Sequence, residues 1–247
     1  MSFDGAFAAH YDAFGSDTDF EGYCSYLERI FLHFKVSPSS IADLGCGTGS
    51  IALALSKREY GVTGVDLSCD MLSIADKKAK AAEVDLKLIC QDFTQLNLNS
   101  CFDAVISCHD SINYLTDKNS IKKLFRGVFF HLKKGGVFVF DLNTEYKYKK
   151  ILDGNTFTYD SEGAYCIWRN AYDEKSLKCM FELTVFEKDF NGLFKRHDSC
   201  SYQRFYGADE IIKMLSDEGF KKAAVFGDRS LRSPRENSER MFFVAVK

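Results

Sequence analysis

Three aspartates follow short apolar runs of the chain: Asp43, Asp66 and Asp92. In a parallel α/β sheet the carboxyl ends of successive strands line one crevice, so we expect these three carboxylates to meet at one ligand. A carboxylate only accepts hydrogen bonds, which suits ribose hydroxyls, an amino group or a positively charged ligand. The same group would repel a pyrophosphate, and this predicts a ligand other than a dinucleotide.

A glycine turn lies between the first two aspartates. Gly45, Gly47 and Gly49 occupy alternate positions, which frees the backbone to turn sharply and lets a ligand approach without meeting a Cβ atom. The next residues, 51–55, favour a helix whose first N–H groups would face the turn. The glycines by themselves are also compatible with an ordinary strand-to-helix connection in an α/β domain. Asp66 favours a binding site, because it lies about 20 residues past the first glycine, where nucleotide folds bind ribose.

The elements that must carry these residues alternate between strand and helix. Apolar runs predict strands at 41–44, 61–66, 86–90, 102–107 and 136–141. Helical periodicity predicts helices at 51–55, 70–82, 118–132 and 209–215. This rhythm is typical of an α/β fold with a doubly wound, mostly parallel sheet covered on both faces. Two final strands, at 220–226 and 241–246, complete a seven-stranded sheet.

Two parts of the chain stand outside this rhythm. Between residues 143 and 206 the pattern changes to β-type alternation with turn signals, which predicts a small antiparallel sheet inserted into the parallel one. The alternating segments are 164–171, 177–189 and 193–206. Residues 3–36 carry apolar side chains at helical spacing and predict two helices that precede the sheet.

The length of 247 residues is compatible with one α/β domain that carries an insertion, and the hydrophobic fraction of 46% allows a substantial core. We assign 1–142 and 207–247 to the α/β domain, with 1–37 as an N-terminal helical lid. Residues 143–206 form the predicted inserted β subdomain.

Composition and charge narrow the functional classes. The net charge of −3 gives no overall electrostatic reason to bind nucleic acid or an anionic membrane. No apolar run approaches the ~20 residues of a membrane helix. The acidic opening stretch, with Arg29 as the first basic residue, argues against a signal or transit peptide. Nine cysteines without a Cys-x-x-Cys pair are expected to be reduced, mostly buried thiols, so we expect a cytoplasmic protein.

The motifs around the aspartates resemble those of class I S-adenosylmethionine-dependent methyltransferases. The stretch from Asp43 to Gly49 looks like that family's first motif, and residues 65–72 and 91–93 resemble its second and third cofactor segments, in the family's order. The resemblance covers residues 40–142 and returns at 207–247. It implies the Rossmann-like methyltransferase fold, S-adenosylmethionine as cofactor and methyltransferase activity.

The resemblance also implies roles for individual residues. Asp43 and the backbone of Gly45 and Gly47 would hold the methionine part of the cofactor. Asp66 would bind the ribose hydroxyls, and Asp92 would accept a hydrogen bond from the adenine amino group. Other members of the predicted cofactor set are Tyr11, Tyr23, Cys46, Leu67, Met71, Phe93 and Cys108. The alternatives are plain core packing for Leu67 and Met71, and a docking stripe for the N-terminal aromatic residues.

The acceptor is expected beside the loop 108–114, which leaves the fourth strand. The family's reaction is a direct displacement, in which the protein aligns the acceptor with the methyl carbon and excludes water. His109 is the candidate general base and Tyr114 the candidate for orienting the acceptor, with a structural role as the alternative for the histidine.

Side chains of the insertion are candidates for an acceptor pocket or a dimer face: Tyr165, Trp168, Arg169, Arg196, His197, Arg204 and Tyr206. Alternation along a strand places Arg196, Arg204 and Tyr206 on one face. If that face covers the crevice, an acceptor that carries a carboxylate or phosphate is expected.

The inserted sheet resembles small-molecule N-methyltransferases of the amino-sugar type. The chain lacks the Asn/Asp-Pro-Pro-Tyr run associated with methylation of base amino groups. Asp141-Leu142-Asn143 is not the adjacent Asp-Asn pair of metal-dependent catechol-type enzymes, so no metal is predicted. We therefore predict methyl transfer to a nitrogen or oxygen of a small-molecule acceptor, no nucleic-acid or membrane partner, and a homodimer through the insertion. Two alternatives stay open: a cofactor-binding regulatory protein without turnover, and a nicotinamide-dependent oxidoreductase.

Overall fold

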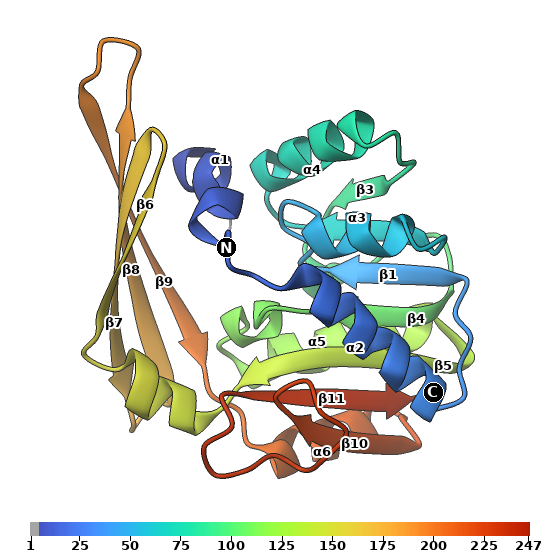
Figure 1. Ribbon diagram of the computed structural model, residues 1–247. Coiled ribbons are helices and arrows are strands. Elements are labelled where there is room, and N and C mark those ends of the chain that lie inside the picture. The colour runs from blue at the N-terminus through green and yellow to red at the C-terminus, as the bar shows by residue number, and fades with distance from the viewer. Residues whose placement is uncertain (1–4) are drawn as a thin grey trace.

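A computed structural model describes residues 5–247, and its centre is a seven-stranded sheet (Figure 1). The strand order is β10-β11-β5-β4-β1-β2-β3. The strands are β1 (Ser40–Leu44), β2 (Gly61–Asp66), β3 (Lys87–Cys90), β4 (Phe102–Ser107), β5 (Leu132–Asn143), β10 (Lys222–Gly227) and β11 (Arg240–Val246). The first five run parallel, and β11 pairs antiparallel with β5 and β10. The predicted doubly wound sheet is confirmed, and its order reverses between β1 and β4, where a ligand crevice is expected.

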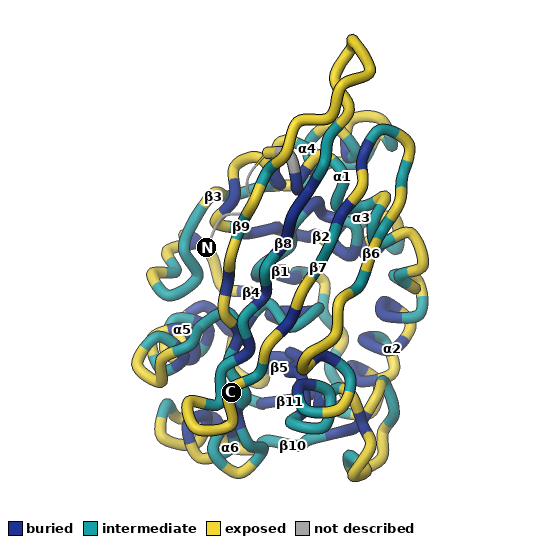
Figure 2. Tube along the Cα trace, turned by 90° about the vertical axis from the view of Figure 1, so that its left-hand side faces the viewer, coloured by how far each residue is buried: buried dark blue, intermediate teal, exposed yellow. Residues whose placement is uncertain are grey.

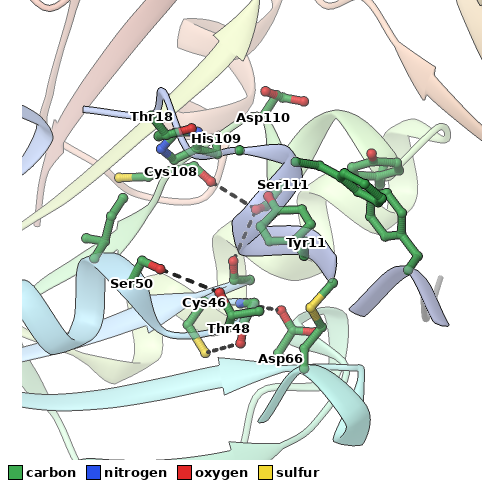
Figure 3. A pocket seen from close by; sticks show the side chains of 18 of the residues that line it. Tyr11, Thr18, Cys46, Thr48, Ser50, Asp66, Cys108, His109, Asp110 and Ser111 are labelled. Atoms are coloured by element: carbon green, nitrogen blue, oxygen red, sulfur yellow. Dashed lines mark hydrogen bonds between the residues drawn. The ribbon is translucent and has the colours of Figure 1, made fainter. Parts of the chain in front are cut away.

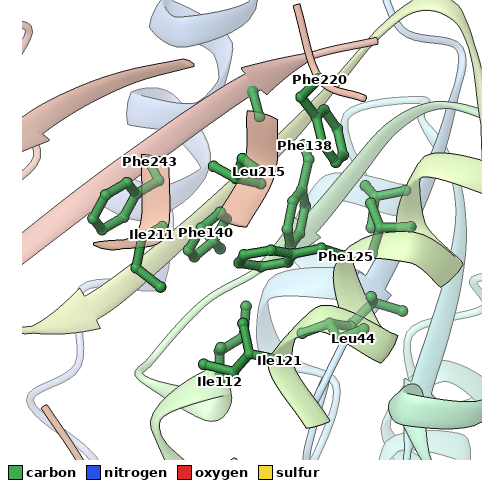
Figure 4. Packing of buried hydrophobic residues seen from close by; sticks show 14 of the residues in the cluster. Leu44, Ile112, Ile121, Phe125, Phe138, Phe140, Ile211, Leu215, Phe220 and Phe243 are labelled. Atoms are coloured by element: carbon green, nitrogen blue, oxygen red, sulfur yellow. The ribbon is translucent and has the colours of Figure 1, made fainter. Parts of the chain in front are cut away.

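Helices cover both faces of this sheet because its strands are apolar on both sides. The helices are α2 (Phe20–His33), α3 (Ser50–Ser56), α4 (Cys69–Ala81), α5 (Lys118–His131) and α6 (Ala208–Asp217). On one face, Phe125 of α5 packs on Phe138 and Phe140 of β5, together with residues of α6 (Figure 4). On the other face, α2 and α3 share a second buried cluster with β1, β5 and β11. The two clusters hold the strand ends rigid, which a precise ligand site requires.

A separate four-stranded antiparallel sheet stands beside the large one (Figure 1). Its strands, in spatial order, are β6 (Thr156–Ser161), β7 (Ala164–Asp173), β8 (Lys178–Lys188) and β9 (Phe194–Arg204). Along β7 and β8 many buried positions alternate with more exposed ones, so one face of this sheet packs inward (Figure 2). This confirms the predicted second, antiparallel sheet.

The first helix, α1 (Gly5–Phe14), lies between α4 and the antiparallel sheet (Figure 1). Phe7 shares a buried cluster with Met71 of α4 and with Cys166 and Leu183 of the antiparallel sheet. Of the predicted lid at 1–37, therefore, only α1 lies over the strand ends, while α2 is part of the layer that covers the large sheet. Residues 1–4 of that prediction lie outside the described part of the chain.

Two features of the connection into the antiparallel sheet were not predicted. A short helical segment, η3 (Lys147–Leu152), follows β5, and β6 precedes the first predicted strand of the insertion. Tyr148 and Leu152 are buried, one helical turn apart, and they pack with Cys179 and Phe181 of β8. A helical turn places side chains four residues apart on one face and next to each other, whereas an extended strand would separate them along its length.

One pair of cysteines departs from the expectation that all nine are free thiols. Cys69 and Cys90 are joined by a disulfide and both are exposed. Four other cysteines are buried free thiols, as expected: Cys24, Cys108, Cys166 and Cys179. Among residues 5–247, no helix combines the length and the apolar character needed to cross a membrane.

Candidate active site

A cavity of about 510 Å³ lies at the carboxyl ends of the parallel strands, and residues of the large sheet's loops, α1 and the antiparallel sheet line it. This volume is in the range of small-molecule sites. Of the predicted cofactor set and the two predicted catalytic residues, all except Tyr23 line this cavity. Those that line it are Tyr11, Asp43, Gly45, Cys46, Gly47, Asp66, Leu67, Met71, Asp92, Phe93, Cys108, His109 and Tyr114.

The glycine turn has the conformation that its sequence predicts. Gly45 has a φ of 73° and Gly47 a φ of 54°, in the left-handed region that favours glycine. A Cβ atom on Gly45 would lie 2.6 Å from the Cβ of Ser111, so the loop after β4 approaches the turn too closely for any side chain. Beside Gly47, by contrast, a Cβ would meet no atom within 4 Å. The turn therefore leaves open space next to its backbone, on the side of the cavity.

Asp66 connects this turn to the loop after β2. Asp66 lies at the edge of the cavity beside the turn (Figure 3), and its Oδ2 accepts a hydrogen bond from the N–H of Gly47 at 2.8 Å. Its Oδ1 accepts a hydrogen bond from the N–H of Ser68 at 2.8 Å. A carboxylate has about four acceptor positions, so each oxygen can accept a further hydrogen bond. Asp66 is thus fixed in place and can still bind two hydroxyl groups.

Asp43 is the most deeply buried acid of the predicted set, with 2% of its surface exposed. Burial, together with the nearby charge of Asp66, raises the pKa of the Asp43 carboxyl to about 7. A positively charged group in the cavity would favour the ionised form and lower this pKa. The site is therefore suited to a cationic ligand.

Asp92 and its neighbours form another part of the wall. The Oδ1 of Asp92 accepts a hydrogen bond from the N–H of Thr94 at 2.8 Å, which starts the short helix η1 (Phe93–Gln95). Its Oδ2 keeps its acceptor capacity for a ligand. Met71 is buried and Leu67 is 40% exposed. Both line the cavity and provide apolar surface there.

The helix α1 is joined to the glycine turn through Asp12, which the sequence analysis missed. Thr48 Oγ1 donates a hydrogen bond to Asp12 Oδ1 at 2.6 Å, and Lys78 Nζ of α4 forms an ion pair with Asp12 Oδ2 at 2.6 Å. The neighbouring Tyr11 lines the cavity (Figure 3), and burial raises its pKa to about 12. No local pattern marks Asp12, because its partners lie far away in the sequence.

Tyr23 does not line the cavity, which corrects its predicted contact with the cofactor. Its ring stacks on that of His109, with 4.3 Å between the centroids, and Arg229 lies over the Tyr23 ring at 5.0 Å. Tyr23 belongs to α2, which packs on the large sheet, so its side chain lies behind the histidine. It packs against His109 from outside the cavity.

His109 itself is at the cavity wall, directly after β4, in a left-handed conformation with a φ of 58°. Burial is the main cause that lowers the pKa of its imidazole, and the charge of Arg240 acts in the same direction. Its Nε2 is buried and forms no hydrogen bond within residues 5–247. A neutral imidazole with a free ring nitrogen can accept a proton.

A buried network around Arg240 is a second feature that the sequence analysis missed. Arg240 Nη2 lies 2.6 Å from Asp110 Oδ1, and Arg240 Nη1 donates to Asp141 Oδ2. Gln203 of β9 donates from Nε2 to Asp110 Oδ2 at 2.6 Å. These bonds connect the loop after β4 to both sheets. Asp110 and Arg240 also line the cavity.

The antiparallel sheet closes the cavity with an apolar wall made of Tyr159, Trp168, Phe181 and Leu183. Of the insertion residues predicted for an acceptor pocket, only Trp168 lines the cavity. The others do not: Tyr165, Arg169, Arg196, His197, Arg204 and Tyr206. Arg196 pairs with Asp198, and Arg204 lies over the ring of Tyr206 at 5.1 Å.

The predicted arginine face therefore does not cover the crevice. The basic residues that line the cavity are Lys147, His109 and Arg240, which come from η3, the loop after β4 and β11. Burial lowers the pKa of Lys147, and the charge of Arg240 lowers it further.

The chain is similar to known proteins over nearly its whole length. A family model described as a methyltransferase domain matches residues 41–136. A methyltransferase-family protein of Geobacillus sp. (strain WCH70) is 33% identical over 243 residues, which cover 98% of each sequence.

Solved structures agree with these sequence matches. An S-adenosylmethionine-dependent methyltransferase from Clostridium acetobutylicum ATCC 824 is 30% identical, with a TM-score of 0.86 and 97% of both chains covered. CalS10, an amino pentose methyltransferase from Micromonospora echinaspora solved with S-adenosylmethionine bound, is 19% identical, with a TM-score of 0.74 over 100% of this chain and 98% of its own. At this identity CalS10 shows a shared fold.

The raised pKa of Asp43 predicts a pH dependence of ligand binding. In the free protein the carboxyl is half protonated near pH 7, and a cationic ligand binds the ionised form. The affinity for S-adenosylmethionine should therefore increase from pH 5.5 to about 7, by up to roughly tenfold per pH unit, and then level off. Calorimetric titration measures this profile. The variant Asp43→Asn should bind more weakly and lose the profile, and a flat profile in the wild-type protein would contradict the role.

The contact between α1 and the glycine turn predicts a second effect. Asp12→Ala removes the hydrogen bond to Thr48 and the partly exposed ion pair to Lys78. We expect the affinity for S-adenosylhomocysteine to fall about 3- to 10-fold, because α1 then covers the ligand less of the time. Asp17→Ala, an exposed acid just after α1, is the matched control and should leave the affinity unchanged. Equal affinities of the two variants would contradict this role of Asp12.

Proposed function

This chain belongs to the S-adenosylmethionine-dependent methyltransferases of class I, and on that premise we propose that it methylates a nitrogen or oxygen atom of a small-molecule acceptor. Its cofactor is S-adenosylmethionine. The observation that carries the proposal is that one cavity joins the glycine turn, Asp43 and Asp66 to His109 and to the apolar wall of the antiparallel sheet.

The residues present fit this cofactor. The open space beside Gly47 admits a ligand against the backbone, and the buried acid Asp43 suits a positively charged amino-acid part. Asp66 keeps acceptor positions for ribose hydroxyls after bonding to two backbone N–H groups. Leu67, Met71 and Phe93 supply apolar surface for the adenine ring. These assignments follow the resemblance residue by residue and are proposals for this chain.

When bound, the cofactor supplies an electrophilic methyl group on a sulfonium, so little covalent chemistry is left to the protein. The chain's own residues must align the acceptor and exclude water. The helix α1 and the antiparallel sheet cover the cavity and serve the second purpose. His109 is proposed to take up the acceptor's proton at Nε2, because the lowered pKa favours the neutral imidazole and this nitrogen has no hydrogen-bond partner within residues 5–247.

The acceptor side of the cavity combines aromatic and charged groups. Trp168 and Phe181 can pack on a ring or an alkyl part of the acceptor. Tyr114, which lines the same region, is proposed to orient it. This composition supports a small, partly apolar acceptor with a polar reacting atom. The shared fold with an amino pentose methyltransferase is consistent with an amine acceptor.

Further proposals concern the setting of the activity. The cytoplasm stays the proposed location, although the Cys69–Cys90 disulfide departs from the reduced thiols expected there. We also keep the homodimer through the inserted sheet as a proposal, which the exposed edge strand β9 supports. Phe194 and Tyr202 on this strand are 59% and 49% exposed. The predicted lack of a catalytic metal stays a prediction.

Turnover with a defined acceptor panel tests the proposed function. Purified protein is incubated with labelled S-adenosylmethionine and amino sugars, amino acids, small amines or small phenols, and methylated products are identified by mass spectrometry. We expect one acceptor class to release S-adenosylhomocysteine in equal amount to product. Tight cofactor binding without turnover across the panel would favour the alternative, a regulatory protein that binds the cofactor without catalysis.

His109→Gln tests the proposed base. With an acceptor that loses a proton in the reaction, kcat should fall about 100-fold at pH 7, while the affinity for S-adenosylhomocysteine stays within twofold. In the wild-type protein kcat should increase as pH rises through the lowered pKa of His109, and the variant should lack this step. His33→Gln, an exposed histidine of α2, is the control and should retain full activity. A fully active His109→Gln variant would remove this residue from the mechanism.

A further inference from the structure

Cys69 and Cys90 are paired at the rim of the cofactor site. Cys69 is the first residue of α4 and Cys90 the last residue of β3. Their sulfur atoms are bonded, with 5.8 Å between the Cα atoms, and 21 positions separate them in the sequence. Both residues are exposed, and so are the free cysteines Cys101 and Cys200. The pair is thus accessible to reagents in solution.

The position of the pair connects two walls of the site. Cys90 is the sheet partner of Asp66, and its Sγ lies 3.5 Å from the carbonyl oxygen of Leu67. Cys69 lies between Leu67 and Met71, while Cys90 lies two residues before Asp92. A bond between them therefore joins two segments of the site. The first, around Asp66 and Leu67, is proposed to hold the ribose and one side of the adenine, and the second, around Asp92, is proposed to hold the adenine amino group.

We propose that Cys69 and Cys90 form a reversible dithiol–disulfide site, oxidised by low-molecular-weight disulfides, whose oxidised form binds the cofactor more tightly. The effect on affinity rests on the proposed roles of the surrounding residues, whereas formation of the bond does not. The strand β3 has four residues and pairs only with β2 at the sheet edge. With the bond reduced, this short pairing, the hydrogen bond from the N–H of Gln91 to the carbonyl oxygen of Asp66 and the packing of Phe93 on the core hold the Asp92 segment, and no covalent link adds to them.

The chemistry is thiol–disulfide exchange in two steps. The Cys69 thiolate attacks one sulfur of an external disulfide, RSSR, so that a mixed disulfide forms and one RS⁻ leaves. The Cys90 thiolate then attacks the Cys69 sulfur, and the second RS⁻ leaves. Two electrons pass from the protein dithiol to RSSR, and the two protons lost by the cysteines appear on the released thiols. The first turn of α4 favours the Cys69 thiolate, because its N–H groups stabilise negative charge.

The physical basis for tighter binding is preorganisation. In the oxidised protein the two walls are held at their bound separation before the ligand arrives, so less ordering accompanies binding. We expect the oxidised protein to bind S-adenosylhomocysteine about 3- to 10-fold more tightly than the reduced protein. The exposed position of the pair gives oxidants and reductants access without unfolding.

Thiol counting and calorimetry test the two parts separately. The full-length protein is reduced or equilibrated with oxidised glutathione, alkylated and analysed by peptide mass spectrometry. We expect the oxidised sample to lose two of its nine thiols to one Cys69–Cys90 link. Titration with S-adenosylhomocysteine should show the affinity difference in the wild-type protein and in the control Cys101→Ser, and no difference in Cys69→Ser or Cys90→Ser.

Two results would overturn the proposal. One is glutathione attached separately to Cys69 and Cys90, as on Cys101 and Cys200, with no link between them. The other is an equal affinity for S-adenosylhomocysteine in the linked and reduced proteins. Failure of the proposed cofactor roles is distinguishable from both, because neither the reduced nor the linked wild-type protein would then bind S-adenosylhomocysteine, while the peptide map would still report the link.

Discussion

The geometry of the site depends on one carboxylate that bonds to two turns. Asp66 accepts hydrogen bonds from the N–H of Gly47, after β1, and from the N–H of Ser68, after β2. Backbone N–H groups in a buried turn need an acceptor, and no strand partner reaches these two. The turn is also tied to β2 by the carbonyl oxygen of Val65, which accepts from Gly45 and Cys46 at 2.7 and 3.1 Å. The same residue that shapes the binding turn is thus available to the ligand.

The acceptor side is fixed to this frame by ionic hydrogen bonds. Arg240, from β11, joins Asp141 of β5 to Asp110 of the loop after β4, and Gln203 extends the connection to β9. Gln203 Oε1 in turn accepts from Tyr148 at 2.9 Å, so η3 is held as well. Buried charges of this kind are costly unless each has its partners, which makes the arrangement specific. The antiparallel sheet is therefore placed by polar contacts, although its inner face is apolar.

Much of the fold could be predicted from the sequence because its signals are local. Strand and helix periodicity predicted the seven-stranded sheet, and the spacing of glycines and acids predicted residues that line one cavity. Asp12 and Arg240 could not be predicted, because their partners lie far away and no short motif marks them. Helical periodicity predicts α2 correctly, but it does not say which surface of the molecule a helix covers. The contact predicted between Tyr23 and the cofactor is therefore replaced by packing on the large sheet.

The same limit applies to the other differences. Alternation placed Arg196 and Arg204 on one face of a strand, yet only the packing of the sheet decides which face meets the cavity. Cys69 and Cys90 are close because β2 and β3 pair in the register that sets Cys90 opposite Asp66. The sequence of each strand alone does not specify this register. Local chemistry was thus predictable, whereas the contacts between elements needed the structure.

The place of α1 has a thermodynamic consequence. Asp12 on this helix contacts the turn proposed to hold the cofactor, and Phe7 and Phe14 of the same helix pack with the sheet proposed to face the acceptor. A ligand that draws α1 closer at one end also orders the other end. Cofactor and acceptor are then coupled through one ten-residue helix. By reciprocity, the factor by which one ligand changes the affinity for the other is the same in both directions.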